Sequence, residues 1–314
     1  MNKISFCIAC YNEVNNVREL VERITLVMSK EQYEYEIIFS DNASTDGTQD
    51  VLREMAKIDK RIKVIINNRN YGPRKSPRNA LRHTTGDAVI GLAADLQDPP
   101  ELIPQFLREW ENGYKLVYGQ KKNSEEGFVK YKLRTLFYNI IDLFSQTPQY
   151  KHISGISLND GKVLEEMLRA DPDISFRNMI AELGYPVKLI PYKQNKRKSG
   201  KSSYNVARYF NFAMDSLIST STAPLRVATV LGCIMSFLSF IVGIIYLVMK
   251  LKHWHQFTMG TAPMVIGMFF LGSVQLLFIG LVGEYVGAVL RKVTKQLPVI
   301  EKELINFDDE QEDE

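Results

Sequence analysis

Cysteine is scarce in this chain, and its scarcity excludes a disulfide-stapled fold, because three cysteines among 314 residues cannot form such a framework. Cys7 and Cys10 do make a Cys-x-x-Cys pair. A zinc site would need two further ligands of suitable spacing, and Cys233 lies in a long apolar run. A redox pair normally opens a helix, whereas Cys7 lies in a strand pattern. We therefore expect both residues of the pair to be small, buried side chains.

Net charge is also small, and two long segments contain no charged residue at all. The formal charge of +3 does not indicate a nucleic-acid partner. No Asp, Glu, Lys or Arg occurs from Val227 to Met249 or from Gln256 to Gly283. Each run exceeds the roughly 20 residues that cross a bilayer core. The sequence predicts transmembrane helices at about 226–250 and 262–287, with two buried core helices as the alternative.

The distribution of basic residues predicts the orientation of these spans. No cleavable signal peptide is expected, since the apolar run Ile4 to Ala9 is short and leads into polar residues. The connecting loop carries only Lys250 and Lys252. The outer flanks of the spans carry more basic residues, namely Arg208, Arg226, Arg291, Lys292 and Lys295. By the positive-inside rule we expect a multi-pass protein of the cell (inner or plasma) membrane with the N-terminal domain and both termini in the cytoplasm.

Short apolar strands alternate with amphipathic helices through the first half of the chain. The strands are expected at 4–9, 35–40, 61–66 and 88–94, and a helix is expected after each of the first three. The third of these helices is expected at 80–84, after a basic Gly/Pro loop at 70–77. This alternation predicts an α/β fold with a mostly parallel sheet covered on both faces.

Polar residues follow three of the four predicted strands. Ligands of such sheets bind beyond the carboxyl ends of the strands. A single Asp or Asn there is often only a turn or helix cap, but three groups at one edge favour a ligand site. The groups are Tyr11-Asn12-Glu13, Asp41-Asn42 and Asp95 with Gln97.

The third group and several basic residues suit a diphosphate and its metal ion. Asp95 and Gln97 offer carboxylate and amide oxygens, which Mg²⁺ and Mn²⁺ prefer. Arg suits bidentate phosphate contacts and Lys acts as a point charge. The basic residues that could face phosphates are Arg74, Lys75, Lys121, Arg134 and Arg197. The alternative for the basic run 193–201 is contact with anionic lipid headgroups.

Five segments together resemble the inverting, nucleotide-sugar-dependent family-two glycosyltransferases. They are SFCIACYNE, SDNASTDGT, NYGPRKSPRNALRHTTGD, AADLQDPPELI and RKSGKSSY. An amphipathic segment ending in STSTAPLR and two spans follow. This order is similar to the polyprenyl-phosphate glycosyltransferase branch, which includes relatives of dolichol-phosphate mannose synthase and bacterial undecaprenyl-phosphate glycosyltransferases.

The resemblance implies a Rossmann-like type A glycosyltransferase domain and a reaction. A sugar would move from a nucleotide diphosphate sugar, expected to be a UDP-hexose or UDP-N-acetylhexosamine, to undecaprenyl phosphate at the cytoplasmic face. The lipid-linked sugar would serve cell-envelope glycan modification. Mg²⁺ or Mn²⁺ is the implied cofactor, and a homo-oligomer is expected. Two alternatives stay open: a transferase acting directly on a glycolipid or polysaccharide, and a non-catalytic nucleotide-sugar-binding membrane protein.

The resemblance also implies roles for individual residues. The implied donor-binding residues are Ala9, Tyr11, Asn12, Glu13, Asp41, Asn42, Arg74, Lys75, Asp95 and Arg197. Those implied for the acceptor phosphate are Lys121, Arg134, Lys201 and Ser202. Asp95 and Gln97 would bind the metal; Asp95, Arg197 and Asp160, a candidate base or helix cap, are the implied catalytic residues. The family commonly has acids where Ala93 and Asn42 stand, so we expect a loosely held metal.

Four regions are therefore expected along the chain. Residues 1–203 form the cytoplasmic glycosyltransferase domain, and 204–223 an amphipathic helix at the membrane surface. The two spans occupy 224–290. Residues 291–314 are expected to be a cytoplasmic acidic tail exposed to solvent.

Overall fold

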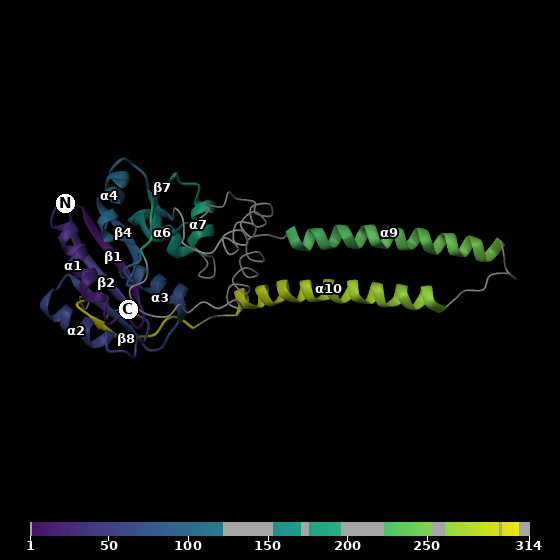
Figure 1. Ribbon diagram of the computed structural model, residues 1–314, viewed down its shortest axis with the longest axis horizontal. Helices are drawn as coiled ribbons and strands as arrows, with labels where there is room; N and C mark the ends of the chain where they lie inside the picture. Colours follow the sequence, from purple (N-terminus) through teal and green to yellow (C-terminus); the bar gives the residue numbers. More distant parts are fainter. Residues whose placement is uncertain are drawn as a thin grey trace, which may run out of the picture. The chain divides into compact units, whose positions relative to one another are not determined.

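The computed structural model describes residues 2–121, 153–170, 176–195, 223–252, 261–294 and 297–307. The chain divides into two compact units. One is built around the β-sheet, and it includes the described segment 297–307. The other contains two long helices, α9 and α10 (Figure 1). The amphipathic helix predicted at 204–223 lies outside the described residues apart from its last position.

A single sheet of eight strands organises the first unit. Its order is β7-β5-β6-β4-β1-β2-β3-β8, and β6 and β8 are its antiparallel members. The strands are β1 (Lys3–Cys10), β2 (Glu34–Asp41), β3 (Ile62–Asn67), β4 (Ala88–Ala93), β5 (Leu116–Lys121), β6 (Ile153–Asp160), β7 (Val187–Tyr192) and β8 (Glu301–Ile305). The predicted α/β fold with a mostly parallel sheet is confirmed.

Helices cover both faces of this sheet, as the near-continuous burial of the residues in β1, β2 and β3 requires. One face packs against α1 (Val17–Met28), α2 (Thr48–Ile58) and α4 (Ile103–Glu111). The other face packs against α3 (Gly72–Leu81) and α6 (Gly161–Arg169), while α7 (Phe176–Leu183) joins α6 against β5. A short 3₁₀ helix, η1 (Pro100–Leu102), precedes α4.

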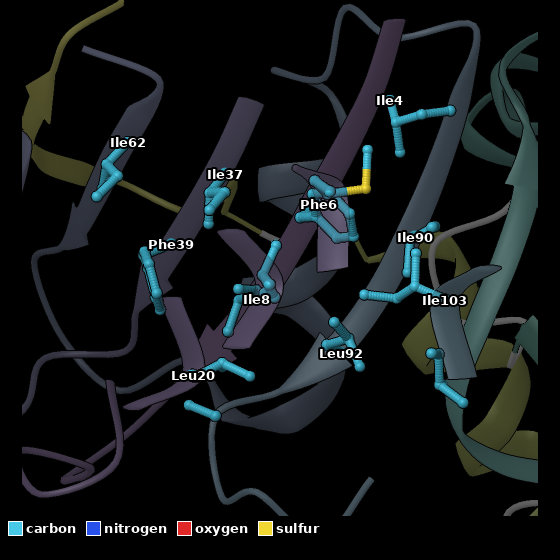
Figure 2. Packing of buried hydrophobic residues seen from close by; sticks show 14 of the residues in the cluster. Ile4, Phe6, Ile8, Leu20, Ile37, Phe39, Ile62, Ile90, Leu92 and Ile103 are labelled. Atoms are coloured by element: carbon cyan, nitrogen blue, oxygen red, sulfur yellow. The ribbon is translucent and has the colours of Figure 1, made fainter. Parts of the chain in front are cut away.

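The larger core lies on the α1, α2 and α4 face. Phe6 on β1 and Phe39 on β2 are fully buried there. Figure 2 shows Leu20 of α1 and Ile103 of α4 beside the strand residues of the same cluster, which include Ile8, Ile90 and Leu92. Cys7 lies on the opposite face and Cys10 on this one, so the two thiols point to different sides of the sheet, and both are buried as expected. Burial raises the pKa of the Cys7 thiol to about 12, so this thiol is held in its protonated form.

The predicted loop at 70–77 is wrong, because α3 begins at Gly72. Pro73 stands in the first turn, where its fixed φ suits the helix and its missing N–H costs no hydrogen bond. The Gly/Pro content indicated a loop, yet here it marks a helix start. Arg74 and Lys75 therefore lie on the first turn of α3.

The C-terminal segment is also different from the predicted exposed tail. Residues Glu301–Ile305 form β8, which pairs antiparallel with β3 at the edge of the sheet. In Figure 1 this strand, drawn in yellow, lies beside the N-terminal elements drawn in purple. Arg53 of α2 donates to both carboxylate oxygens of Glu303, so this acidic side chain is paired and not part of a solvated tail. Residues 308–314 lie outside the described part.

The second unit contains the two apolar helices, α9 (Ala223–Lys252) and α10 (Thr261–Val293). Each predicted span lies within one of these helices. Their most apolar stretches, Val227–Ile245 and Phe270–Leu290, have mean hydropathies of 2.4 and 1.7, and neither is buried within the protein. By length and composition, both helices can cross a membrane.

Candidate functional site

The sheet brings the predicted polar groups to one edge, which we call the rim. In the parallel register Cys10 pairs with Asp41, and Ala9 pairs with Ala93. Thus β1, β2 and β4 end level with one another, and the residues that follow them lie side by side. The carboxyl ends of β3, β5 and β7 and the start of β6 are at the same edge. This is where open α/β sheets bind ligands.

The loops after β1 and β2 are bound to each other by backbone-to-side-chain hydrogen bonds. The Asn12 N–H donates to Ser44 Oγ at 2.8 Å, and the Thr45 N–H donates back to Asn12 Oδ1 at 2.9 Å. The Glu13 N–H donates to Thr48 Oγ1, and the buried Glu13 carboxylate accepts from Asn16. Two of the implied donor-binding residues, Asn12 and Glu13, therefore build the loop as well as line it.

Tyr11 and Asp41 differ sharply in exposure at this part of the rim. The Tyr11 ring is 43% exposed, so it can lie against a base or sugar. Asp41 is fully buried, and its Oδ2 accepts from the Ser44 N–H at 3.0 Å and from Gln49 Nε2 at 2.9 Å. These two donors hold the Asp41 carboxylate in a fixed orientation at the end of β2.

Asn42 has a role that an acid could not fill. Its Oδ1 accepts from the Tyr71 N–H at 2.8 Å, and its Nδ2 donates to Asn70 Oδ1 at 2.9 Å. Asn70 Oδ1 also accepts from the Gly72 N–H, so backbone donors fix the orientation of both amides. Asn42 thus shapes the turn that enters α3.

We predict that Asn42→Asp weakens nucleotide binding although it restores the acid common in the family. The carboxylate would place an oxygen against Asn70 Oδ1, and loss of this part-buried hydrogen bond costs about 1–3 kcal/mol, or roughly five- to 150-fold in Kd if it falls on the bound state. Calorimetric titration with UDP measures the change. Asn42→Ala is the control; binding by Asn42→Asp at wild-type strength would contradict the role given to the amide.

Asp95 and Gln97 emerge from β4 in a tight turn. The Gln97 N–H donates to Asp95 Oδ1 at 3.2 Å, and Leu96 between them adopts a φ of +57°. A left-handed conformation is unfavourable for a leucine, so it persists only where its surroundings enforce it. The Leu96 side chain is buried in the core, which anchors the turn. Asp95 and Gln97 are consequently held half-exposed at the rim.

The donor set fits a hard cation that takes few ligands from protein. Asp95 supplies carboxylate oxygens and Gln97 an amide oxygen, whereas Ala93 supplies none. Gln97 Oε1 accepts from Gln194 Nε2 at 3.3 Å, which orients the amide and leaves a second lone pair. Within the described ranges no three His, Cys, Asp or Glu side chains gather into a metal cluster. Mg²⁺ commonly binds through one or two side chains plus substrate phosphates, and these two residues suit that arrangement.

The remaining described members of the implied site are also located. Ala9 accepts at its carbonyl from the Ala94 N–H, which joins β1 to the metal turn. Lys121 ends β5 at the rim, and its charge favours the ionised form of Asp98. On α3 Arg74 is exposed and Lys75 half-exposed. The predicted residues Arg134, Arg197, Lys201 and Ser202 lie outside the described residues.

Asp160 is at the wrong end of the sheet for a catalytic base. Because β6 runs antiparallel to β4, Asp160 pairs with Ala88, at the opposite end of β4 from Asp95. It stands at the N-cap position of α6, and its Oδ2 accepts from Trp110 Nε1 at 2.9 Å and Lys115 Nζ at 2.7 Å. Burial alone would raise its pKa, but these two donors outweigh burial and hold the pKa below its ordinary value. The candidate base is thereby corrected to a structural acid.

Asp160→Asn is therefore expected to leave the rate of sugar transfer within about threefold of wild type. The change weakens the bond to Lys115, so the apparent unfolding temperature should fall, as expected for a charged hydrogen bond worth about 1.5–3 kcal/mol. Initial rates and thermal unfolding of the same preparation test both parts. A hundredfold loss of rate in a stably folded variant would instead indicate that Asp160 takes part in catalysis.

Several rim residues escaped the sequence reasoning because nothing in their local pattern marks them. Ser44 and Gln49 hold Asp41, and Asn70 holds Asn42. Asp98, directly after Gln97, is 3% exposed and accepts from Tyr192 OH at 2.5 Å. Burial raises the pKa of Asp98 above its ordinary value. Its signal was its place in the run DLQDPP, where it reads equally well as a turn residue.

Comparison with known proteins agrees with this architecture. Residues 5–165 match the model of Glycosyl transferase family 2, and residues 223–289 match the GtrB C-terminal hairpin. The glycosyltransferase YkcC of Bacillus subtilis (strain 168) is 31% identical over 287 residues, which cover 91% of this chain and 88% of that protein. Bactoprenol glucosyl transferase of Shigella phage SfX is 29% identical over 298 residues, covering 94% of this chain and 97% of that protein.

Among solved structures, the mannosyltransferase PcManGT from Pyrobaculum calidifontis, in complex with GDP-Man and Mn²⁺, is similar at a TM-score of 0.48. It is 16% identical, and the match covers 94% of this chain and 88% of that one. The family model covers strands β1 to β6 with the rim residues that follow β1, β2 and β4, and the hairpin model covers α9 and most of α10. This chain is therefore a glycosyltransferase that belongs to glycosyl transferase family 2 and carries the GtrB C-terminal hairpin.

Proposed function

We propose that this protein transfers a sugar from a uridine diphosphate hexose or N-acetylhexosamine to a polyprenyl phosphate, undecaprenyl phosphate, with inversion at the anomeric carbon. The observation that carries the proposal is the rim itself, where the loops after β1 and β2 lie beside the turn of Asp95 and Gln97. The names of relatives called bactoprenol glucosyl transferase support the acceptor.

The two halves of the rim suit the two halves of the donor. Buried Asp41, held by Ser44 and Gln49, is placed to bind the ribose, and exposed Tyr11 to cover the base. The turn of Asp95 and Gln97 then lies where the diphosphate extends along the sheet edge. A bound divalent ion would neutralise charge on that diphosphate and so favour its departure.

The reaction itself needs little acid–base chemistry from the protein. An acceptor phosphate oxygen, already anionic near neutral pH, attacks the anomeric carbon and forms the new C–O bond. The bond to the nucleotide breaks on the opposite side, and UDP leaves with the electron pair. Positioning and charge neutralisation therefore account for most of the rate. This agrees with the location of Asp160 away from the rim.

The hairpin gives the enzyme access to a membrane-bound acceptor. The helices α9 and α10 are apolar over lengths that span a bilayer. Arg226, Arg291 and Lys292 lie at the outer ends of the two apolar stretches, whereas Lys250 and Lys252 lie at the end of α9 that precedes the connection to α10. We place the catalytic domain and both termini at the cytoplasmic face of the cell membrane, and we assign the lipid-linked sugar to cell-envelope glycans.

A donor screen read on lipid-extracted product tests this proposal. Purified full-length protein is incubated with undecaprenyl phosphate, Mn²⁺ or Mg²⁺, and radiolabelled UDP-glucose, UDP-galactose, UDP-N-acetylglucosamine or GDP-mannose. We expect labelled lipid with one UDP-sugar and none without the acceptor. The proposal fails if no donor labels the lipid, or if label appears only on an added glycolipid or polysaccharide.

Metal dependence gives a further prediction, since the protein supplies only two side chains to the ion. We expect transfer to fall steeply as divalent ion is withdrawn, and Ala93→Asp to shift the half-maximal Mn²⁺ concentration down about tenfold by adding one carboxylate beside Asp95. Initial rates across an Mn²⁺ titration measure this shift. Asp95→Ala provides the low-affinity reference. A half-maximal Mn²⁺ concentration that Ala93→Asp leaves unchanged would mean that residue 93 does not face the ion.

A further inference from the structure

We infer that Asp98 is a positioning residue that locks the metal turn to the exit of strand β7. The inference rests on the proposed function, in which Asp95 and Gln97 hold the ion that accompanies the donor. Asp98 does not itself face the ion: it is 3% exposed and lies behind the turn. We call its contacts with Tyr192 and Gln194 the latch.

The latch and a neighbouring backbone hydrogen bond join two segments that are far apart in sequence. Tyr192 OH donates to Asp98 Oδ1 at 2.5 Å, and Gln194 Nε2 reaches the same oxygen at 3.3 Å. The Asn195 N–H donates to the Gln97 carbonyl at 2.9 Å. Side chain and backbone of the metal turn are therefore both bound to residues 192–195.

The latch explains how the strained turn keeps its shape. Leu96 has a φ of +57°, a left-handed conformation that is unfavourable for a leucine. Burial of the Leu96 side chain fixes one side of the turn, and the bonds to Asp98 and the Gln97 carbonyl fix the other. Without the latch the turn can relax and move the Asp95 carboxylate away from the Gln97 amide.

The side chains of Asp98 and Tyr192 leave no room for a Cβ atom at Gly155. This glycine, at the start of β6, has a φ of +83°. A Cβ there would lie 2.4 Å from both Asp98 Oδ2 and Tyr192 OH, a distance that no carbon–oxygen contact tolerates. The Asp98 carboxylate and the Tyr192 phenol thus require glycine at position 155, in addition to the requirement set by its positive φ.

The position of the latch suggests what it couples. Gln194 and Asn195 belong to the basic run 193–201, which also contains Arg197. Gln194 Nε2 donates to Gln97 Oε1 and the Asn195 N–H donates to the Gln97 carbonyl, so this part of the run is bonded directly to a proposed metal ligand. The latch therefore holds the turn that carries Asp95 and Gln97 against residues 192–195.

Tyr192→Phe tests the latch, and Tyr118→Phe is its matched control. Both phenols are buried and donate at 2.5 Å to a side-chain oxygen, but Tyr118 bonds Asn159, near the far end of β6. Free Mn²⁺ is followed by its paramagnetic resonance signal as full-length protein is titrated in the presence of UDP. We expect Tyr192→Phe to weaken Mn²⁺ binding about tenfold, because the turn that carries Asp95 and Gln97 loses a contact that fixes its shape, and groups beyond the ligands commonly have effects of this size.

The same titration separates positioning from mere stability. Tyr118→Phe should lower the unfolding temperature as much as Tyr192→Phe does and leave Mn²⁺ affinity within about twofold of wild type, because its lost bond lies away from the turn. In transfer assays Tyr192→Phe should raise the half-maximal Mn²⁺ concentration, and saturating Mn²⁺ should restore kcat. Gly155→Ala should reproduce the Mn²⁺ defect by displacing Asp98.

The inference is overturned if the two phenylalanine variants bind Mn²⁺ equally, or if wild type binds no Mn²⁺. These binding measurements need no acceptor lipid. If wild type binds Mn²⁺ with UDP but labels no lipid, the proposed acceptor is wrong. The role of Asp98 is still tested in that case, because the Mn²⁺ affinities of the two phenylalanine variants can be compared.

Discussion

Alanine in place of Asp95 is expected to lower kcat/KM for sugar transfer by about a thousandfold, the loss seen when a main charge-stabilising group is removed from a reaction centre. Asp95 is the one carboxylate that the turn after β4 presents at the rim, since Ala93 has no oxygen and Asp98 is turned into the latch. No second acid in this turn can take over its role.

The measurement is a comparison of initial rates with that donor which labels the lipid. Asp160→Asn serves as the matched control, because it removes an acid from the far end of the sheet. Asp95→Asn should recover part of the binding of UDP and little of the rate. Full activity in a folded Asp95→Ala protein would contradict both the role given to Asp95 and the proposed metal site.

The second large effect concerns stability and lies at the edge of the sheet opposite the rim. Glu36 on β2 is 2% exposed. Its carboxylate accepts from Ser5 Oγ at 2.6 Å, from Lys3 Nζ at 2.9 Å and from the Thr85 N–H at 3.0 Å, and Lys63 Nζ lies 3.0 Å away. This acid joins three strands and the loop before β4 through one side chain.

Glu36→Ala is therefore expected to destabilise the sheet domain by about 3 kcal/mol, because it leaves two lysines and a backbone N–H without their shared acceptor. Thermal unfolding of the full-length protein in detergent should show a lower transition for the sheet domain. Glu54→Ala, at an exposed ion pair with Arg18, is the control and should change little. Equal shifts in the two variants would contradict the role of Glu36.

The same carboxylate makes stability depend on pH in a defined direction. Burial would raise the pKa of Glu36, but its hydrogen bonds with Ser5 and Lys3 prevail and lower it to about 2. A lowered pKa in the folded state contributes stability at every pH above the unfolded value, near 4.3. That contribution declines as the pH falls from about 4.5 to 2. Wild type should lose stability over this window, and Glu36→Gln should lose less.

The sequence predicted the strands and helices that have a regular pattern of apolar residues. The strands around Phe6, Phe39 and Ile90 are short apolar runs between amphipathic helices, and burial on both faces of a parallel sheet demands that pattern. The helix at Gly72 and the strand at Glu301 escaped prediction for opposite reasons. Pro73 looked like a loop breaker although it fits a first helical turn, and β8 depends on an edge of β3 that is distant in sequence.

For the site, the residues directly after strand ends were predictable, because parallel strands must bring their carboxyl ends together. Asp41, Asn42, Asp95 and Gln97 follow from that rule alone. Asp160 did not, since its place depends on the direction of β6, and one antiparallel strand moves a residue from one end of the sheet to the other. A strand's direction is set by its neighbours and not by its own residues.

The sequence alone thus determined the chemistry available to this protein: oxygen ligands after β4, polar loops after β1 and β2, and two apolar helices near the C-terminal end. Only the tertiary structure decided which of these groups meet. It bonded Asn42 to Asn70, removed Asp160 from the rim, and joined Asp98 to Tyr192 across 94 residues. The physical reason is that a hydrogen bond between distant segments requires a common geometry, which the packed sheet supplies and no local pattern of residues records.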